Sequence, residues 1–158
     1  RNIGIDVFLV VGHRGEKIRD CLKNRDITIV YNPDYMKGMF SSIKAGIRQL
    51  KPEHRAFFML PVDIPLVETG TIITVLGAGV SHPENIIYPV FHGKRGHPPL
   101  IPSGLVAGIL RWKKDGGLKS FLASHESLAL DVPVTDRFIL FDIDTGEDYR
   151  ELLKQYHV

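Results

Sequence analysis

An apolar run that ends in an aspartate between two prolines is the feature that most limits how this chain can fold. Residues 57–60 read as a strand buried on both faces, and Asp63 follows between Pro61 and Pro65. Strands buried on both faces belong to parallel sheets that are covered by helices. Ligands of such sheets bind in the crevice beyond the carboxyl ends of the strands. A carboxylate held there by two proline rings therefore indicates a metal or phosphate site.

Apolar runs and amphipathic stretches alternate along the sequence, which is typical of an α/β fold with a mostly parallel sheet covered on both faces. We find no internal repeat or linker, so we expect one domain over residues 1–158. The predicted strands are residues 7–11, 27–31, 56–60, 86–91, 100–101, 128–132 and 138–141. The predicted helices are residues 16–23, 40–50, 68–76, 104–112, 118–125 and 145–156, the last with Thr145 as its cap and Asp148 three residues on.

Composition and charge narrow the class of protein. With 158 residues, 44% of them hydrophobic, the chain can bury a sizeable core. A net charge of +2 does not indicate non-specific binding to nucleic acid. No apolar stretch approaches the roughly 20 residues of a membrane span. The single cysteine, Cys21, cannot form an internal disulfide or a cysteine metal cluster, and we expect it to be buried. These features together favour a soluble, cytoplasmic protein.

A second group of acids closes another apolar run. Asp142 and Asp144 follow residues 138–141, far from Asp63 in the sequence. Magnesium prefers a few carboxylates completed by water and substrate phosphates. We therefore interpret Asp63 as a magnesium ligand, with Asp144 as its partner and Asp142 as the alternative. The structural alternatives are a turn aspartate at 63 and a favourable helix N-terminal charge at 144.

Two further segments could bind an anionic or nucleotide ligand. Gly38 precedes Ser41 and Ser42 in the first turn of a predicted helix, where free N–H groups and hydroxyls can bind a base or a phosphate. Helix capping explains the serines equally well. Residues 92–97 combine two cations and two histidines with glycines, which suits an anion or a solvated basic turn. The sequence has no serine elbow and no cysteine with a nearby base, which favours metal-assisted phosphoryl transfer.

Four of these segments, taken in order, resemble the motifs of the molybdenum-cofactor nucleotidyltransferases. They are residues 32–42, 60–66, 93–98 and 142–149, which together span nearly the whole chain. The branch that uses CTP and molybdopterin is the most similar. The resemblance implies a Rossmann-like three-layer sandwich. It also implies transfer of CMP from CTP to a molybdopterin-type acceptor, with release of pyrophosphate.

The resemblance also implies roles for individual residues. It implies that Asp63 and Asp144 hold a catalytic Mg²⁺. The residues implied to lie near the nucleotide or the acceptor are Gly38, Ser41, Ser42, Arg95, Gly96 and His97. Transient contact with molybdoenzymes or cofactor chaperones would follow from such an activity. Two alternatives stay open, namely a transferase of the same superfamily that uses GTP or another acceptor, and a non-catalytic nucleotide- or cofactor-binding domain.

The chain departs from the family pattern in two places. Gly146 follows Thr145 where the family has proline, which loosens the first helical turn without removing an acid. The family also opens with a strand and a glycine-rich loop whose arginine and lysine grip the triphosphate. This sequence begins at Arg1 without such a segment, so we expect a domain that lacks the family's first strand and phosphate loop.

We therefore predict that the 158-residue chain alone transfers CMP poorly or not at all, because most of the donors that bind the triphosphate would be missing. Release of pyrophosphate from CTP in the presence of the acceptor measures this activity. Robust turnover by the 158 residues alone would refute the prediction.

Overall fold

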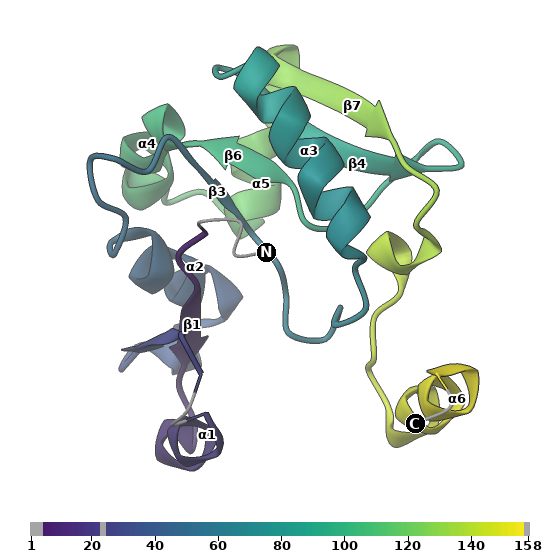
Figure 1. Ribbon diagram of the computed structural model, residues 1–158. Coiled ribbons are helices and arrows are strands. Elements are labelled where there is room, and N and C mark those ends of the chain that lie inside the picture. The colour runs from purple at the N-terminus through teal and green to yellow at the C-terminus, as the bar shows by residue number, and fades with distance from the viewer. Residues whose placement is uncertain (1–4, 23–24, 157–158) are drawn as a thin grey trace. The chain divides into compact units, whose positions relative to one another are not determined.

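The computed structural model describes residues 5–22 and 25–156 (Figure 1). The chain divides into two compact units. The first comprises the chain up to His54 together with Leu105–Ser124, and the second comprises Arg55–Gly104 and the chain from His125 onward. Within the described residues each unit has its own sheet, with two strands in the first unit and five in the second.

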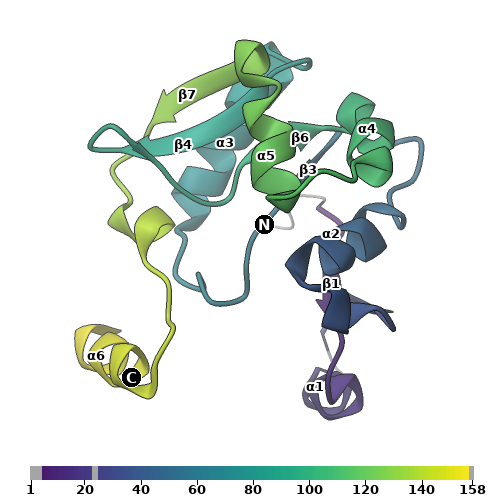
Figure 2. The same ribbon diagram turned by 180° about the vertical axis from the view of Figure 1, so that it is seen from behind.

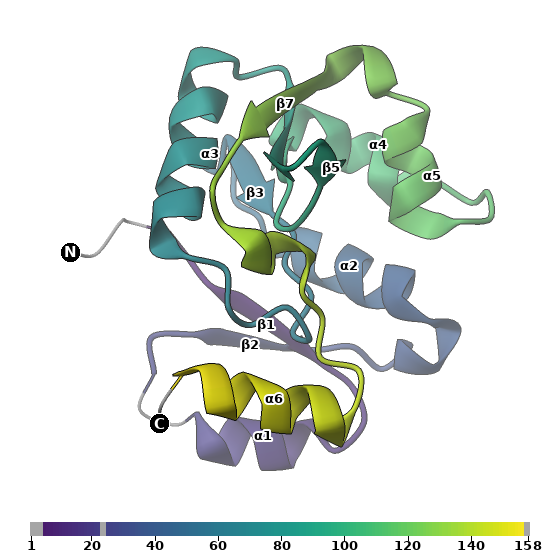
Figure 3. The same cartoon turned by 90° about the vertical axis from the view of Figure 1, so that its right-hand side faces the viewer.

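The first unit is built on a pair of parallel strands. Strands β1 (Phe8–Val11) and β2 (Thr28–Tyr31) pair over their whole length and are joined through helix α1 (Gly15–Cys21), as Figure 3 shows. A Cβ added at Gly15 would lie only 2.7 Å from Cγ2 of Val11. The absence of a side chain at Gly15 therefore lets α1 begin close to the strand that precedes it.

Helices α2 (Met39–Ile47), α4 (Val106–Arg111) and α5 (Gly117–Ala123) also belong to the first unit. Helix α2 packs against both strands and contacts α4 and α5. The Lys44 ammonium donates a 2.7 Å hydrogen bond to the carbonyl of Trp112, which lies just after α4. This bond ties α2 to the segment between the two later helices.

The second unit contains a mixed sheet (Figure 2). Its strands are β3 (Ala56–Phe58), β4 (Ile86–Phe91), β5 (Lys94–Arg95), β6 (Leu100–Pro102) and β7 (Ala129–Pro133). The order is β3-β6-β4, and β4 also pairs with β5 and β7. Strand β6 is antiparallel to both β3 and β4, and β7 is parallel to β4. Strands β3, β4 and β7 therefore run in one direction, with β6 reversed between the first two.

Helix α3 (Thr69–Ser81) packs on this sheet (Figure 1). Val75 of α3, Ile87 of β4 and Leu100 of β6 form a buried cluster. Burial of an aliphatic side chain of this size contributes about 1.5–3 kcal/mol, so the cluster holds the helix on the sheet. The other helical segments of the described chain are η1 (Tyr35–Lys37), η2 (Ser103–Leu105), η3 (Glu126–Leu128), η4 (Arg137–Leu140) and α6 (Gly146–Tyr156).

The α/β fold class is confirmed, but one predicted strand is wrong. Residues 138–141 were expected to be extended, whereas the chain forms the 3₁₀ turn η4 there. The Asp136 carboxylate accepts a 2.9 Å hydrogen bond from the Phe138 N–H and so caps the turn. Within η4, Ile139 is the buried side chain. A short apolar run cannot be assigned to strand or helix from periodicity alone.

Smaller expectations have mixed outcomes. The cap of α6 is confirmed, since Asp148 Oδ2 accepts a 2.7 Å bond from the Thr145 N–H and the Asp148 N–H donates at 3.2 Å to Thr145 Oγ1. Cys21 is exposed and not buried, because α1 turns Gly15 towards the strands. The predicted end of that helix at Lys23 lies outside the described residues. Among the described helices, none is long and apolar enough to cross a membrane.

Two glycines of α3 offer a matched test of its packing. A Cβ at Gly79 would collide with the Leu100 side chain, whereas one at Gly77 would meet no atom within 4 Å. We predict that Gly77→Ala raises the free energy of unfolding by up to about 1 kcal/mol, because alanine favours the helix. Gly79→Ala should lower it by about 1 kcal/mol or more, because it overpacks the core. Denaturant unfolding compares the two variants, and equal shifts would contradict this packing.

Candidate metal and nucleotide site

Asp63 lies in a turn that follows β3 in the second unit. The turn is closed by a 3.2 Å hydrogen bond from the Ile64 N–H to the Pro61 carbonyl, and the Ile64 side chain is buried. Strand β3 ends at Phe58, so Asp63 stands several residues beyond the strand and not at its last residue. The prolines and the buried isoleucine fix the position of the carboxylate between them.

The Asp63 carboxylate contains a buried oxygen without a partner. Its Oδ1 is inaccessible to solvent and makes no hydrogen bond with the described part of the chain. An unsatisfied buried polar atom costs about 1–3 kcal/mol, so its presence in a folded protein needs an explanation. A turn aspartate would satisfy this oxygen with a backbone N–H. A bound cation would satisfy this oxygen as well. The exposed acids Asp142 and Asp144, on the segment that is hydrogen-bonded to the Asp63 turn, agree with this explanation.

Backbone hydrogen bonding brings the second acidic segment to the Asp63 turn. The Ile143 N–H donates a 2.7 Å hydrogen bond to the carbonyl of Asp63. Asp142 and Asp144, on either side of Ile143, are exposed. The Asp144 N–H donates to Asp148 Oδ2 at 3.2 Å, so the start of α6 also holds this residue. Two acids far apart in the sequence are thus carried by segments that touch.

The acidic side chains at this turn would suit a metal ion that the protein coordinates with only one or two carboxylates. The described residues contain no group of three or more histidine, cysteine, aspartate or glutamate side chains that could hold a metal. Mg²⁺ is commonly held by one or two carboxylates, with water and substrate phosphates completing its octahedron. Asp63 and Asp144 would supply that number of carboxylates.

Arg95 is committed to contacts within the protein. It lies in β5, which follows β4 through a two-residue turn at His92 and Gly93, both with positive φ. Its guanidinium bonds both carboxylate oxygens of Glu126, at 3.0 and 2.7 Å, and Oδ1 of Asp131 at 2.5 Å. These hydrogen bonds raise the pKa of Arg95 above its ordinary value. The basic segment is thus a hairpin turn in which Arg95 ties β5 to η3 and β7.

Gly96 and His97 hold the turn η4. The His97 N–H donates a 2.9 Å hydrogen bond to the Ile139 carbonyl, and the Gly96 N–H donates at 2.9 Å to Pro89. A Cβ at Gly96 would lie 2.5 Å from the same Ile139 oxygen. Packing therefore accounts for glycine at this position. The His97 ring lies near the chain that leads to Asp63, with Nδ1 3.5 Å from the Met59 carbonyl.

Gly38, Ser41 and Ser42 belong to the first unit, where Asn32 organises them. Gly38 has φ of 90° and precedes α2, with open space where a Cβ would lie. The Asn32 amide is 3% exposed and donates to Ser41 Oγ at 2.9 Å and to Ser42 Oγ at 3.0 Å. Ser41 Oγ in turn donates to the Gly38 carbonyl at 2.8 Å. The serines thus form part of a fixed polar network and do more than begin a helix.

Sequence reasoning missed the role of Asp136. This carboxylate is 3% exposed and accepts hydrogen bonds from the Glu68 N–H at 2.8 Å and the Thr71 hydroxyl at 2.9 Å, besides that from Phe138. It therefore joins the start of α3 to η4. An aspartate directly before an apolar run is a cap signal that could have indicated a turn. Its link to α3 has no signal in the local sequence.

The fold of the chain is that of the nucleotidyltransferases. The chain belongs to the MobA-like NTP transferase domain family, whose model matches residues 1–129. The molybdenum cofactor cytidylyltransferase of Escherichia coli is 26% identical to it over 151 residues, which cover 95% of this chain and 75% of that enzyme. The family resemblance found in the sequence motifs is therefore confirmed.

Two solved structures illustrate the shared fold. A Mycobacterium tuberculosis protein in complex with manganese matches with a TM-score of 0.77 at 19% identity, over 94% of this chain and 77% of that one. The 4-diphosphocytidyl-2C-methyl-D-erythritol synthase of Anaerococcus prevotii matches with a TM-score of 0.75 at 14% identity, over 100% of this chain and 82% of that one. The Rossmann-like sandwich implied by the sequence motifs is consistent with both.

The ion pair between Arg95 and Glu126 gives a pH-dependent prediction. Hydrogen bonds from Arg95 lower the pKa of Glu126 below its ordinary value of 4.5. Because this pKa is lowered in the folded state, the stabilisation is present above about pH 4.5 and is lost as the pH falls through the folded pKa. In an NMR titration, the Glu126 carboxyl should titrate below 4.5 in the parent protein and return towards 4.5 in Arg95→Gln.

An unchanged Glu126 midpoint in Arg95→Gln would show that Arg95 is not held by this carboxylate in solution.

Proposed function

We propose that this protein transfers CMP from CTP to the phosphate of a molybdopterin-type acceptor and releases pyrophosphate. The family supports a nucleotidyltransferase, and the relative that shares 26% identity over 95% of the chain is a cytidylyltransferase for the molybdenum cofactor. The observation that carries the proposal is the buried Oδ1 of Asp63, which has no hydrogen-bond partner among the described residues and lies on a turn bonded to the segment that bears Asp144.

Asp63 and Asp144 are proposed to hold Mg²⁺, the ion that such a partial carboxylate site prefers. When bound, the ion would offset charge on the phosphate oxygens. The acceptor phosphate attacks the α-phosphorus of CTP in line, a new P–O bond forms, and the bond to the β-phosphate breaks. No protein nucleophile takes part, so the chain contributes positioning and charge.

The polar network of the first unit is proposed to bind the nucleotide. Asn32 donates to both serine hydroxyls, which fixes their orientation, and Ser41 and Ser42 would lie near the base and ribose. The open space at Gly38 allows a ligand to approach the backbone closely. Arg95, Gly96 and His97 are proposed to lie on the acceptor side, where the His97 N–H bond to the Ile139 carbonyl fixes the segment that leads to Asp144. The protein would work in the cytoplasm and meet molybdoenzymes or cofactor chaperones transiently.

Removal of the proposed metal ligands tests this function in the full-length protein. We predict that Asp63→Asn and Asp144→Asn each slow CMP transfer at least about a thousandfold, because several kcal/mol of transition-state stabilisation would be lost. Glu151→Gln, which removes an exposed acid of α6, is the matched control and should retain its rate within about threefold.

The assay is run with CTP and with GTP, and the Mg²⁺ dependence of the rate is measured for each variant. An enzyme that prefers GTP would contradict the base assignment alone. Full activity of Asp63→Asn, with unchanged Mg²⁺ dependence, would contradict the proposed site.

A further inference from the structure

The chain that follows Asp63 and the chain that leads to Asp144 are hydrogen-bonded to each other at two places. At one end, the Ile143 N–H donates to the Asp63 carbonyl at 2.7 Å. At the other end, the Glu68 N–H donates to the Asp136 carboxylate at 2.8 Å. Residues 63–68 and 136–143 therefore form two short sides that are joined at both ends, and we call this arrangement the frame.

One buried side chain, that of Asp136, joins the two sides of the frame at the end opposite Ile143. It is 3% exposed, and its Oδ2 accepts both the Glu68 N–H and the Thr71 hydroxyl. Its Oδ1 accepts the Phe138 N–H at 2.9 Å. Loss of this carboxylate would leave three donors without their acceptor, and buried donors of this kind are costly to leave unsatisfied.

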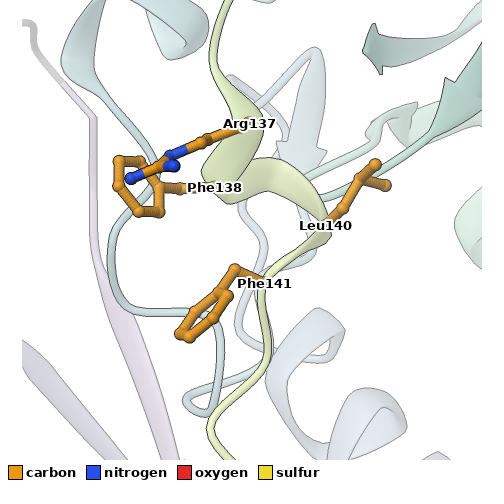
Figure 4. Close-up of a pocket in the computed structure, with 4 residues that line it drawn as sticks. All are labelled: Arg137, Phe138, Leu140 and Phe141. Atoms are coloured by element: carbon orange, nitrogen blue, oxygen red, sulfur yellow. The ribbon is translucent and has the colours of Figure 1, made fainter. Parts of the chain in front are cut away.

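The two sides of the frame are anchored separately in the second unit. Helix α3, which begins at the Glu68 end, is held on the sheet by the buried Val75. The turn η4 is anchored by Ile139, whose side chain is buried and whose carbonyl accepts the His97 N–H. The other residues of η4 line a pocket of about 260 Å³ together with Phe141 (Figure 4). The bonds of Asp136 therefore fix η4 directly to the start of α3.

The frame carries both proposed metal ligands at its other end. Asp63 is the first residue of one side, and Asp144 directly follows the last residue of the other. Two carboxylates that share an ion must be placed precisely, and a displacement of about 1 Å at a reacting centre can cost about a hundredfold in rate. A shift of η4 against α3 would reach the acids through only a few residues on each side.

We propose that Asp136 is a positioning residue for the metal site. Its hydrogen bonds hold η4 and the start of α3 in the arrangement in which Asp63 and Asp144 share one ion. This inference rests on the proposed function for the metal site itself. It adds a residue that is not a ligand of the ion and that acts through the backbone of the frame.

The first measurement is the affinity of the full-length protein for Mn²⁺ alone, from the electron paramagnetic resonance signal of the free ion. We expect Asp136→Ala to weaken Mn²⁺ binding about tenfold or more, as the loss of groups that orient metal ligands commonly does. Asp136→Asn keeps one acceptor oxygen and should weaken it about threefold. Both variants remove the same charge, so the difference between them reports the hydrogen bonds.

Thr71→Val is the matched control. It removes the hydroxyl that donates to Asp136 and leaves the bonds from the Glu68 and Phe138 N–H groups in place. It should lower the free energy of unfolding, yet change the Mn²⁺ affinity less than about twofold. A loss of affinity that follows stability alone would therefore appear in this variant as well.

The second measurement is hydrogen exchange of the Ile143 amide in the metal-free protein, which requires neither an ion nor turnover. The reference is the Ser103 amide, which donates to the Arg55 carbonyl elsewhere in the same unit. We expect the rate at Ile143 relative to that at Ser103 to rise about tenfold in Asp136→Ala, less in Asp136→Asn, and not at all in Thr71→Val. The ratio separates local opening of the frame from global unfolding.

Asp63→Asn, measured alongside, separates failure of this inference from failure of the proposed function. If Asp63→Asn leaves Mn²⁺ binding unchanged, the metal site is wrong, and the role of Asp136 is overturned with it. If Asp63→Asn weakens Mn²⁺ binding, the role of Asp136 alone is overturned by an unchanged affinity in Asp136→Ala, by equal losses in the Ala and Asn variants, or by an unchanged exchange ratio at Ile143. Should Asp136→Ala not fold, an unchanged affinity and exchange ratio in Asp136→Asn would overturn the proposal.

Discussion

One backbone hydrogen bond underlies the candidate site, namely that from the Ile143 N–H to the Asp63 carbonyl. It joins the turn after β3 to the segment between η4 and α6, which are far apart in the sequence. Further bonds hold the segment that precedes Ile143, since His97 fixes η4 through Ile139 and Asp136 fixes η4 to α3. The acids are thus carried by segments whose backbone is fixed before any ligand binds, which is the requirement for a precise site.

The buried oxygen of Asp63, which has no hydrogen-bond partner among the described residues, is the observation that favours a ligand site over a purely structural turn. A carboxylate that served only the turn would use its buried oxygen to accept a hydrogen bond, as Asp136 does from three donors. Asp63 Oδ1 accepts none from the described residues. A buried group that is left unsatisfied lowers stability, so it calls for an explanation, such as a catalytic role or an ion or water that completes it.

The sequence predicts those features that depend on local pattern. The α/β alternation, the cap formed by Thr145 and Asp148, and the family motifs follow from residues close together in the chain. Features that depend on distant partners could not be predicted. The reversed direction of β6 leaves no mark in its three apolar residues, and a run such as 138–141 fits a turn as well as a strand. The residues next to Arg95 do not indicate that its guanidinium donates to Glu126 and Asp131. Its motif therefore predicts a contact with a ligand, whereas the hydrogen bonds that Arg95 makes in the structure are structural.

The proposed site requires Asp63 and Asp144 to bind one ion. A crystal of the full-length protein soaked with Mn²⁺, which shares the oxygen-rich octahedral preference of Mg²⁺, tests this directly through anomalous scattering. We predict one peak within about 2.5 Å of a carboxylate oxygen of each residue. Separate peaks at the two residues, or a peak that contacts neither, would contradict the shared site.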